Sequence, residues 1–200
     1  MDIVPIVAIV IFLVGSIPPG QIFGWINKKN VAATGSGSTG ATNTGRVLGV
    51  GWGILTGFID VSKGYACFLI ACYAGLPNNG WLLALSFMGV LGHCFSPWLR
   101  FHGGKGVATA FGIMLCFDSY VALGAVVTFA VLIILSKRVS VGSCCAALSL
   151  IPLSMLLYSD TPGVLPAMAC LTVFILVMHR GNIGRLLSGT EPKLSLKRAT

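Results

Sequence analysis

The sequence predicts an all-α integral membrane protein with about seven transmembrane helices, forming a single domain over residues 1–200. First, 56% of the residues are apolar and only 9% are charged, giving a mean hydropathy of +0.92, which is far too hydrophobic for a soluble globule. Second, the apolar residues gather in long runs. Third, the basic residues gather in every second connection between those runs. A chain of 200 residues also has the length of one domain.

Seven apolar runs can be placed along the chain, over residues 3–25, 50–74, 81–99, 107–117, 120–136, 141–158 and 164–178. A helix needs roughly 20 residues to cross the hydrocarbon of a bilayer. The fourth run is shorter, so we expect its helix to begin below the membrane surface or to pack within the bundle. The first run has no basic residues before it, and Lys28 and Lys29 follow it, which favours a retained span over a signal peptide.

The charges provide a test of this count. If the chain crosses the membrane at each run, the connections alternate between two sides. Twelve of the thirteen basic residues then fall on one side, and the thirteenth, Lys63, lies within a run. The other side has no Lys or Arg but carries Asp2, Asn78, Asn79, Asp118 and Asp160. By the positive-inside rule the basic side faces the cytoplasm, which puts the amino terminus outside and the carboxyl terminus inside.

The composition argues against several classes of protein. The net charge of +8 follows the predicted topology, so it indicates no nucleic-acid partner. The seven cysteines form neither a disulfide framework nor a zinc site, because their number is odd and their spacing lacks the motif pairs. Acidic residues are too few and dispersed for a divalent-metal site, so we expect no metal and no cofactor.

A polar segment over residues 35–46 combines four glycines with hydroxyl side chains, Asn43 and Arg46. Glycines allow positive φ and close backbone approach, so such a segment can hold a phosphate or carboxylate without a metal. Gly35 and Gly40 have the spacing of a P-loop, but Ala41 stands where that motif needs Lys, which excludes nucleotide hydrolysis. The alternative is a flexible linker between two spans.

Two further polar segments lie on the basic side. Gly103-Gly104-Lys105-Gly106 precedes the short fourth run, where a helix amino terminus and a lysine would attract an anion; the alternative is a topological lysine beside a turn. After the last run, His179 and Asn182 share one face if the segment is helical. The alternative there is a basic amphipathic helix resting on the membrane surface.

Asp60 and Lys63 lie three residues apart inside the second run. Each would cost about 2.5–3.5 kcal/mol at the bilayer centre, so we expect the two side chains to pair in the bundle interior. Whether Lys63 is structural or also contacts substrate stays open. His93 and Cys94 are adjacent and point apart on a helix, which argues against a nucleophilic Cys/His pair.

Taken together, these segments resemble the PlsY family of small bacterial membrane acyltransferases. The matching residues run in family order over nearly the whole chain: Gly35-Ser36-Gly37, Gly40-Ala41-Thr42-Asn43, Arg46, Asp60, Lys63-Gly64, Gly92-His93, the stretch from Gly103 to Thr109, His179-Arg180, Asn182-Ile183, Arg185-Leu186-Leu187, Gly189 and Glu191. The family usually has Asn in place of Ser38 and Lys in place of His102.

The resemblance implies transfer of a fatty acyl group from acyl phosphate to glycerol 3-phosphate, giving lysophosphatidic acid and phosphate. It implies a multi-pass protein of the bacterial inner membrane whose site faces the cytoplasm and whose partners are these two substrates and membrane lipid. As catalytic residues it suggests Ser36, Asn43, Lys105 and His179. As substrate-binding residues it suggests Gly35, Gly37, Ser38, Thr42, Arg46, Lys63, Gly103, Gly104, Ser140, Asn182 and Arg185.

The residue inventory offers many cations and N–H donors but no evident protein nucleophile. We therefore expect direct transfer between two bound substrates, with Lys105 and the backbone of residues 35–46 stabilising developing charge. The substrate's own phosphate would accept the hydroxyl proton, with His179 as the alternative base. The main rival function is a membrane transporter for a phosphorylated solute, although no internal repeat is visible. A membrane-assembly partner without chemistry would leave the anion-binding segments unexplained.

Overall fold

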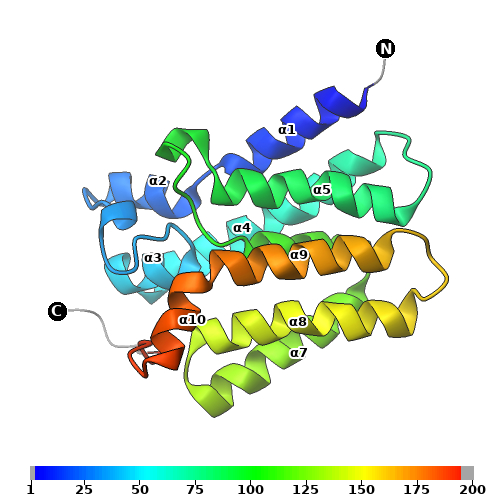
Figure 1. The fold of residues 1–200 in the computed structure, drawn as a ribbon. Coiled ribbons are helices and arrows are strands. Elements are labelled where there is room, and N and C mark those ends of the chain that lie inside the picture. The colour runs from blue at the N-terminus through cyan, green and yellow to red at the C-terminus, as the bar shows by residue number, and fades with distance from the viewer. Residues whose placement is uncertain (1–2, 195–200) are drawn as a thin grey trace.

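The computed structural model describes residues 3–194, and this part of the chain is helical, without strands (Figure 1). Asp2, Lys197 and Arg198, which were counted in the predicted topology, lie outside the described residues. The α-helices are α1 (Val4–Ser16), α2 (Pro19–Ile26), α3 (Ala41–Leu48), α4 (Val50–Cys72), α5 (Asn79–Cys94), α6 (Val107–Phe117), α7 (Ser119–Ser136), α8 (Val139–Leu157), α9 (Val164–Met178) and α10 (Arg180–Leu187), with 3-10 turns η1 (Val31–Ala33) and η2 (Pro97–Leu99).

The long helices run side by side, which confirms the all-α membrane fold (Figure 1). Within the described residues, α4, α7, α8 and the stretch Asn79–Leu99, in which η2 continues α5, are each long and apolar enough to cross a membrane. Two bent pairs, α1 with α2 and α9 with α10, raise the number of candidate spans to six. The predicted fourth run forms α6, which has 11 residues and packs against α4, α5 and α7 inside the bundle. The count of about seven thus includes one helix too short to cross alone.

The first run, predicted as one span over residues 3–25, is broken into two helices that together are apolar and long enough for one span. α1 ends at Ser16, and α2 begins at Pro19 after a bend of 40°. The cause is the pair Pro18-Pro19, because a proline cannot donate the helical hydrogen bond and pushes the residue before it toward extended backbone. Ile17 accordingly has ψ near 121°. The break leaves the Ile17 carbonyl free to accept a hydrogen bond from another helix.

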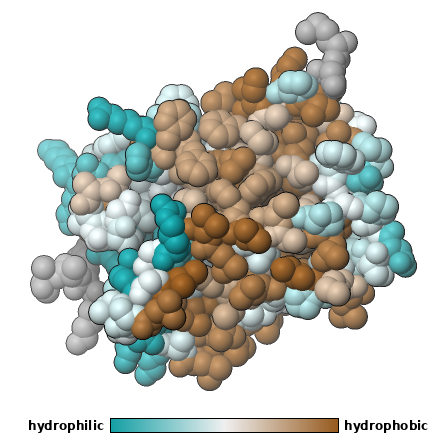
Figure 2. Space-filling model, in the orientation of Figure 1, coloured by the Kyte–Doolittle hydropathy of each residue, from teal (hydrophilic) through white to brown (hydrophobic). Residues whose placement is uncertain are grey.

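The core is apolar and closely packed. Val90, Ile113 and Met168 lie at the centre of a cluster shared by α5, α6 and α9, and a second cluster joins α1, α4 and α5 around Ile11 and Cys67. The middle of the face shown in Figure 2 is brown, and many large apolar side chains of the described helices are exposed. Such a surface is expected where the surrounding solvent is lipid.

The two ends of the bundle separate the charges as predicted. At one end, Lys29 Nζ donates to the Val47 carbonyl, and Arg138 Nε donates to the Glu191 carbonyl. At the other, the Tyr158 hydroxyl donates to the Asp118 carboxylate. The connections over residues 27–40, 95–106 and 137–138 and the chain after α9, which carry basic residues, lie at one end, whereas those over residues 73–78 and 158–163, which have no Lys or Arg, lie at the other (Figure 1).

Candidate active site

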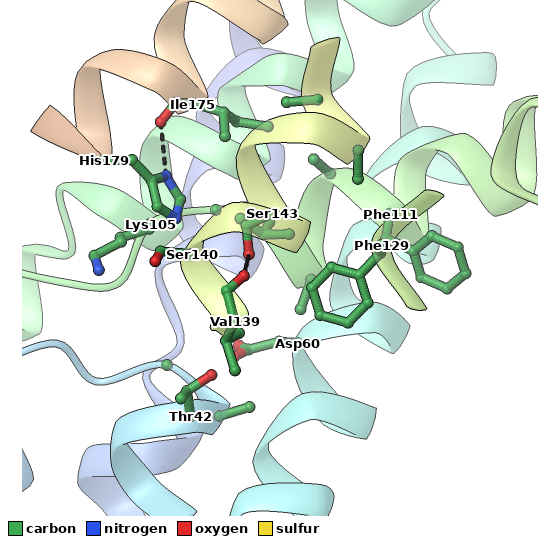
Figure 3. A pocket seen from close by; sticks show the side chains of 18 of the residues that line it. Thr42, Asp60, Lys105, Phe111, Phe129, Val139, Ser140, Ser143, Ile175 and His179 are labelled. Carbon is green, nitrogen blue, oxygen red and sulfur yellow. Dashed lines mark hydrogen bonds between the residues drawn. The ribbon is translucent and has the colours of Figure 1, made fainter. Parts of the chain in front are cut away.

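A cavity of about 340 Å³ lies in the bundle at the basic end, between α3, α4, α6, α7, α8 and α9. Figure 3 shows that its lining is divided. Lys105, Ser140 and His179 lie on one side, whereas Phe111 and Phe129 lie on the other. Farther from the polar residues the walls consist of small and aliphatic side chains, including Met114 and Leu150. A cavity of this kind suits a molecule with a charged head and an apolar tail.

Residues 35–40 form an ordered loop and residues 41–46 begin α3, so this segment is not a flexible linker. The buried side chain of Asn43 donates through Nδ2 to the carbonyls of Val31 and Thr34 at 3.1 and 2.8 Å. Its Oδ1 accepts from the Ser36 N–H at 2.9 Å. Gly35 has φ of +66° and would, with a Cβ, overlap Asn43 Oδ1, so only glycine fits there. Asn43 thus shapes the loop through its own hydrogen bonds.

The loop before α6 carries Lys105 into the cavity. The Gly103 N–H donates to the Cys94 carbonyl at 2.9 Å, and the Gly104 N–H donates to the His93 carbonyl at 3.1 Å, so the loop is fastened to the end of α5. Lys105 Nζ donates to Asn182 Oδ1 at 2.5 Å. Burial, together with the nearby Arg185 and Arg46, lowers the pKa of Lys105 below its ordinary value, despite an opposing effect of Glu191.

Glu191 joins the residues after α9 into one network. Its carboxylate accepts from Asn182 Nδ2 at 2.7 Å and from Arg185 Nε at 2.8 Å, and its side chain is only 4% exposed. Burial raises the pKa of Glu191, but the nearby donors of Asn182, Ser140 and Arg185 outweigh it and leave the pKa below its ordinary value. The charged carboxylate therefore holds Asn182 in place against Lys105.

His179 lines the cavity from the end of α9. Its Nδ1 lies 2.8 Å from the Ile175 carbonyl (Figure 3). Because a carbonyl can only accept, Nδ1 carries a proton, and the neutral ring keeps a lone pair on Nε2. The hydroxyl of Ser140 also faces the cavity and is buried beside the Glu191 carboxylate, although within residues 3–194 it makes no hydrogen bond of standard geometry. These two groups have hydrogen-bonding capacity to offer a bound molecule.

The predicted pairing of Asp60 and Lys63 is confirmed, with 2.8 Å between Lys63 Nζ and Asp60 Oδ1. Lys63 Nζ also lies 2.8 Å from the Ile17 carbonyl and 2.8 Å from His93 Nδ1. Three acceptors thus surround an ammonium group that has three N–H bonds. Asp60 and His93 line the cavity, whereas Lys63 lies behind them. This geometry favours the structural alternative for Lys63.

Most of the predicted site residues come together around the cavity. Its walls include nine of them: Ser36, Ser38, Thr42, Asn43, Arg46, Lys105, Ser140, His179 and Asn182. The other six are not among its lining residues: Gly35, Gly37, Lys63, Gly103, Gly104 and Arg185. Among residues 3–194, no group of three His, Cys, Asp or Glu side chains is placed to hold a metal ion.

Sequence reasoning missed three kinds of residue at this site. Glu191 matched the resemblance but was not assigned to the site, and only its contacts reveal it. His93 was considered as part of a nucleophile and rejected, but it reaches the cavity wall as the partner of Lys63. The apolar lining, with Phe111 and Phe129, carries no sequence signal that distinguishes it from other core residues.

Comparisons with known proteins agree over nearly the whole chain. The sequence model of a family described as glycerol-3-phosphate acyltransferase matches residues 5–189. A relative of that name from Synechococcus elongatus is 34% identical, with 97% of this chain and 96% of the relative covered. Another, from Trichlorobacter lovleyi, is 38% identical, with 91% of this chain and 93% of the relative covered.

Two solved structures have the same fold. Both are of PlsY (YgiH), described as an integral membrane glycerol 3-phosphate acyltransferase. The glycerol 3-phosphate form has a TM-score of 0.89 at 32% identity, and the lysophosphatidic acid form has a TM-score of 0.86 at 31% identity. Each comparison covers 96% of both chains.

Proposed function

This chain belongs to the glycerol-3-phosphate acyltransferase family, and on that premise we propose that it transfers a fatty acyl group from acyl phosphate to glycerol 3-phosphate. The products are lysophosphatidic acid and phosphate. The whole of residues 1–200 serves this reaction as one transmembrane domain.

The single observation that carries the proposal is the division of the cavity lining. The acyl tail lies along the apolar wall near Phe111, Phe129 and Met114. The phosphates lie at the polar mouth, where Lys105 and Arg46 supply charge. The reacting carbonyl then falls at the boundary, next to the groups that can stabilise negative charge.

The reaction needs no covalent intermediate on the protein. The glycerol 3-phosphate hydroxyl oxygen attacks the acyl carbonyl, a new C–O ester bond forms, and the bond between the carbonyl carbon and the phosphate oxygen breaks. The hydroxyl proton leaves with phosphate, which acts as the base. Lys105 and the N–H groups of residues 35–46 stabilise the charge on the carbonyl oxygen and leaving phosphate, while Ser36, Ser140 and Asn182 orient the substrates. Asn43 contributes by shaping the loop.

The unprotonated Nε2 of His179 supports a second candidate for the base. If His179 takes the hydroxyl proton, His179→Ala lowers kcat by about 10²–10⁴-fold. If phosphate takes it, the same substitution changes KM for glycerol 3-phosphate more than kcat. Steady-state kinetics of this variant decide between the two.

The protein lies in the bacterial inner membrane with its cavity toward the cytoplasm. The support is the separation of charges between the two ends of the bundle, since the cavity opens among the basic connections. A membrane-impermeant cysteine reagent tests this orientation on a cysteine-free variant carrying Ser188→Cys. Labelling in inside-out vesicles but not in intact cells is expected, and the reverse pattern would contradict it.

The decisive experiment supplies the purified protein with glycerol 3-phosphate and with acyl phosphate or acyl-CoA in turn. Lysophosphatidic acid forms from acyl phosphate and is lost in Lys105→Ala. Product from acyl-CoA alone would overturn the choice of donor. Solute uptake into sealed vesicles without any product in detergent would instead establish the rival transporter.

A further inference from the structure

The buried triad Asp60–Lys63–His93 is not used by the mechanism above, although two of its members reach the cavity wall. Its members come from α4 and α5, and its third contact, the Ile17 carbonyl, lies at the break between α1 and α2. Three charged or titratable groups in a hydrocarbon-facing bundle are costly to keep. Their position against the Lys105 loop indicates what they do.

The His93 side chain is held in one orientation. His93 Nδ1 lies 2.8 Å from Lys63 Nζ and 3.4 Å from Asp60 Oδ1, so both members of the ion pair hold this edge of the ring. His93 is only 7% exposed, and its ring packs on the side of α5 that faces Gly104. Asp60 balances the charge of Lys63 at 2.8 Å. Ring rotation would therefore leave a buried ammonium without one of its acceptors.

The same ring supports the loop that carries Lys105. A Cβ on Gly104 would overlap His93 Nε2, so the ring fills the space that any other residue would need there. The backbone adds a second link, because the Gly104 N–H donates to the His93 carbonyl at 3.1 Å. Gly104 thus lies on a fixed surface, and the next residue along the chain is Lys105.

We propose that Asp60, Lys63 and His93 form a positioning unit that seats Gly104 and thereby sets the place of the Lys105 ammonium at the cavity. The inference deepens the proposed acyl transfer and rests on it. In this proposal the three residues act through Lys105 and not through a contact with substrate. Their effect is on catalysis because a displacement of about 1 Å at a reacting centre can cost about 100-fold in rate.

The test uses substitutions that change the contact between the His93 ring and Gly104 while keeping the fold. His93→Asn retains an acceptor for Lys63 but lacks the ring edge under Gly104. Gly104→Ala places a methyl group where the ring lies. Combining the two lets the new methyl group fill the space that the ring vacated. His102→Asn, in an exposed part of the same loop, is the matched control.

Two readouts are measured for all variants: kcat with acyl phosphate and glycerol 3-phosphate, and hydrogen exchange of the Gly103–Lys105 amides. We expect kcat to fall by about 100-fold in each single variant and the double variant to recover about tenfold of that loss. Exchange at Gly104 should rise in His93→Asn and return toward wild type in the double variant. The thermal midpoint of His93→Asn and all properties of His102→Asn should remain near wild type.

Full activity in His93→Asn, or a double variant no better than Gly104→Ala, would overturn the positioning role. A large fall in the thermal midpoint of His93→Asn together with the fall in kcat would also overturn the positioning role, because it would show that the triad is purely structural. If the wild-type protein makes no lysophosphatidic acid from either donor, the proposed function fails. The exchange data then still show by themselves whether His93 seats the loop.

Discussion

Two lysines of this protein lie in polar surroundings within the helical bundle, and they differ in what surrounds their ammonium groups. Lys63 has three acceptors at 2.8 Å, one of them the carboxylate of Asp60. Lys105 has one hydrogen-bond acceptor among the described residues, the amide oxygen of Asn182, and no carboxylate in contact. The charge of Lys63 is satisfied by the protein, whereas Lys105 keeps N–H bonds free. A cation with free donors facing a cavity is available to an anionic substrate.

The largest effect that we expect is a loss of stability when Lys63, but not Lys105, is replaced by alanine. Lys63→Ala leaves the Asp60 carboxylate buried without its partner, so we expect a loss of about 3–5 kcal/mol in the free energy of unfolding. Denaturation in detergent measures it. The double variant Asp60→Asn/Lys63→Met removes both charges and should lose much less. Equal losses in the single and double variants would show that the ion pair is not what Lys63 contributes.

The next effect concerns Lys105 and appears in catalysis. Lys105→Ala should lower kcat/KM by about 10²–10³-fold, which is the usual cost of removing one donor to developing negative charge. Its thermal midpoint should change little, because the loop is held by backbone hydrogen bonds to α5. Lys28→Ala, on the exposed surface, is the control for loss of a positive charge alone. A marked fall in the stability of Lys105→Ala without loss of turnover would show that Lys105 is structural and not catalytic.

Glu191 supports Lys105 through Asn182, and its replacement should have a smaller effect. Glu191→Gln keeps the shape but removes the charge, so we expect a loss of about 1.5–3 kcal/mol in stability. The pKa of Glu191 is below the ordinary value of 4.5, so its contribution is present above that value and is lost as pH falls through the lower folded-state pKa. The free energies of unfolding of wild type and Glu191→Gln, measured from neutral to acidic pH, should therefore become equal in acid.

The smallest effect is the alkaline limb of the rate profile. Burial and two nearby arginines lower the pKa of Lys105, so its ammonium loses the proton at lower pH than an exposed lysine would. An arginine stays charged throughout this range. Lys105→Arg should therefore be slower near neutral pH, and its kcat should persist to higher pH than that of wild type. Parallel alkaline limbs would mean that another group controls this part of the profile.

The parts predicted well from sequence were those with local or periodic signals. Asp60 and Lys63 are three residues apart, so their pairing follows from helix geometry, and the short fourth run appears as α6 over the expected residues. The separation of charges between the two ends followed from the alternation of connections. The prolines at 18 and 19 are a sequence signal for the break between α1 and α2, but the apolar run is continuous across them, so hydropathy alone predicts one span.

The parts that could not be predicted depend on contacts between distant residues. His93 lies 30 residues from Lys63, and Lys105 lies 77 residues from Asn182. Nothing in a single sequence fixes which of three histidines meets a buried lysine. Likewise Phe111 and Phe129 face the cavity because α6 and α7 pack at a particular rotation, and their neighbours in sequence are equally apolar.

The segment after α9 has a consequence for biosynthesis. His179, Asn182 and Glu191 complete the mouth of the cavity, and the Leu194 N–H donates to the Lys137 carbonyl as the chain returns over the α7–α8 connection. Earlier helices can enter the bilayer while the ribosome is still translating, but the catalytic mouth has no final wall until residue 191 has emerged. We therefore expect a chain cut before residue 191 to enter the bilayer but to lack acyl-transfer activity.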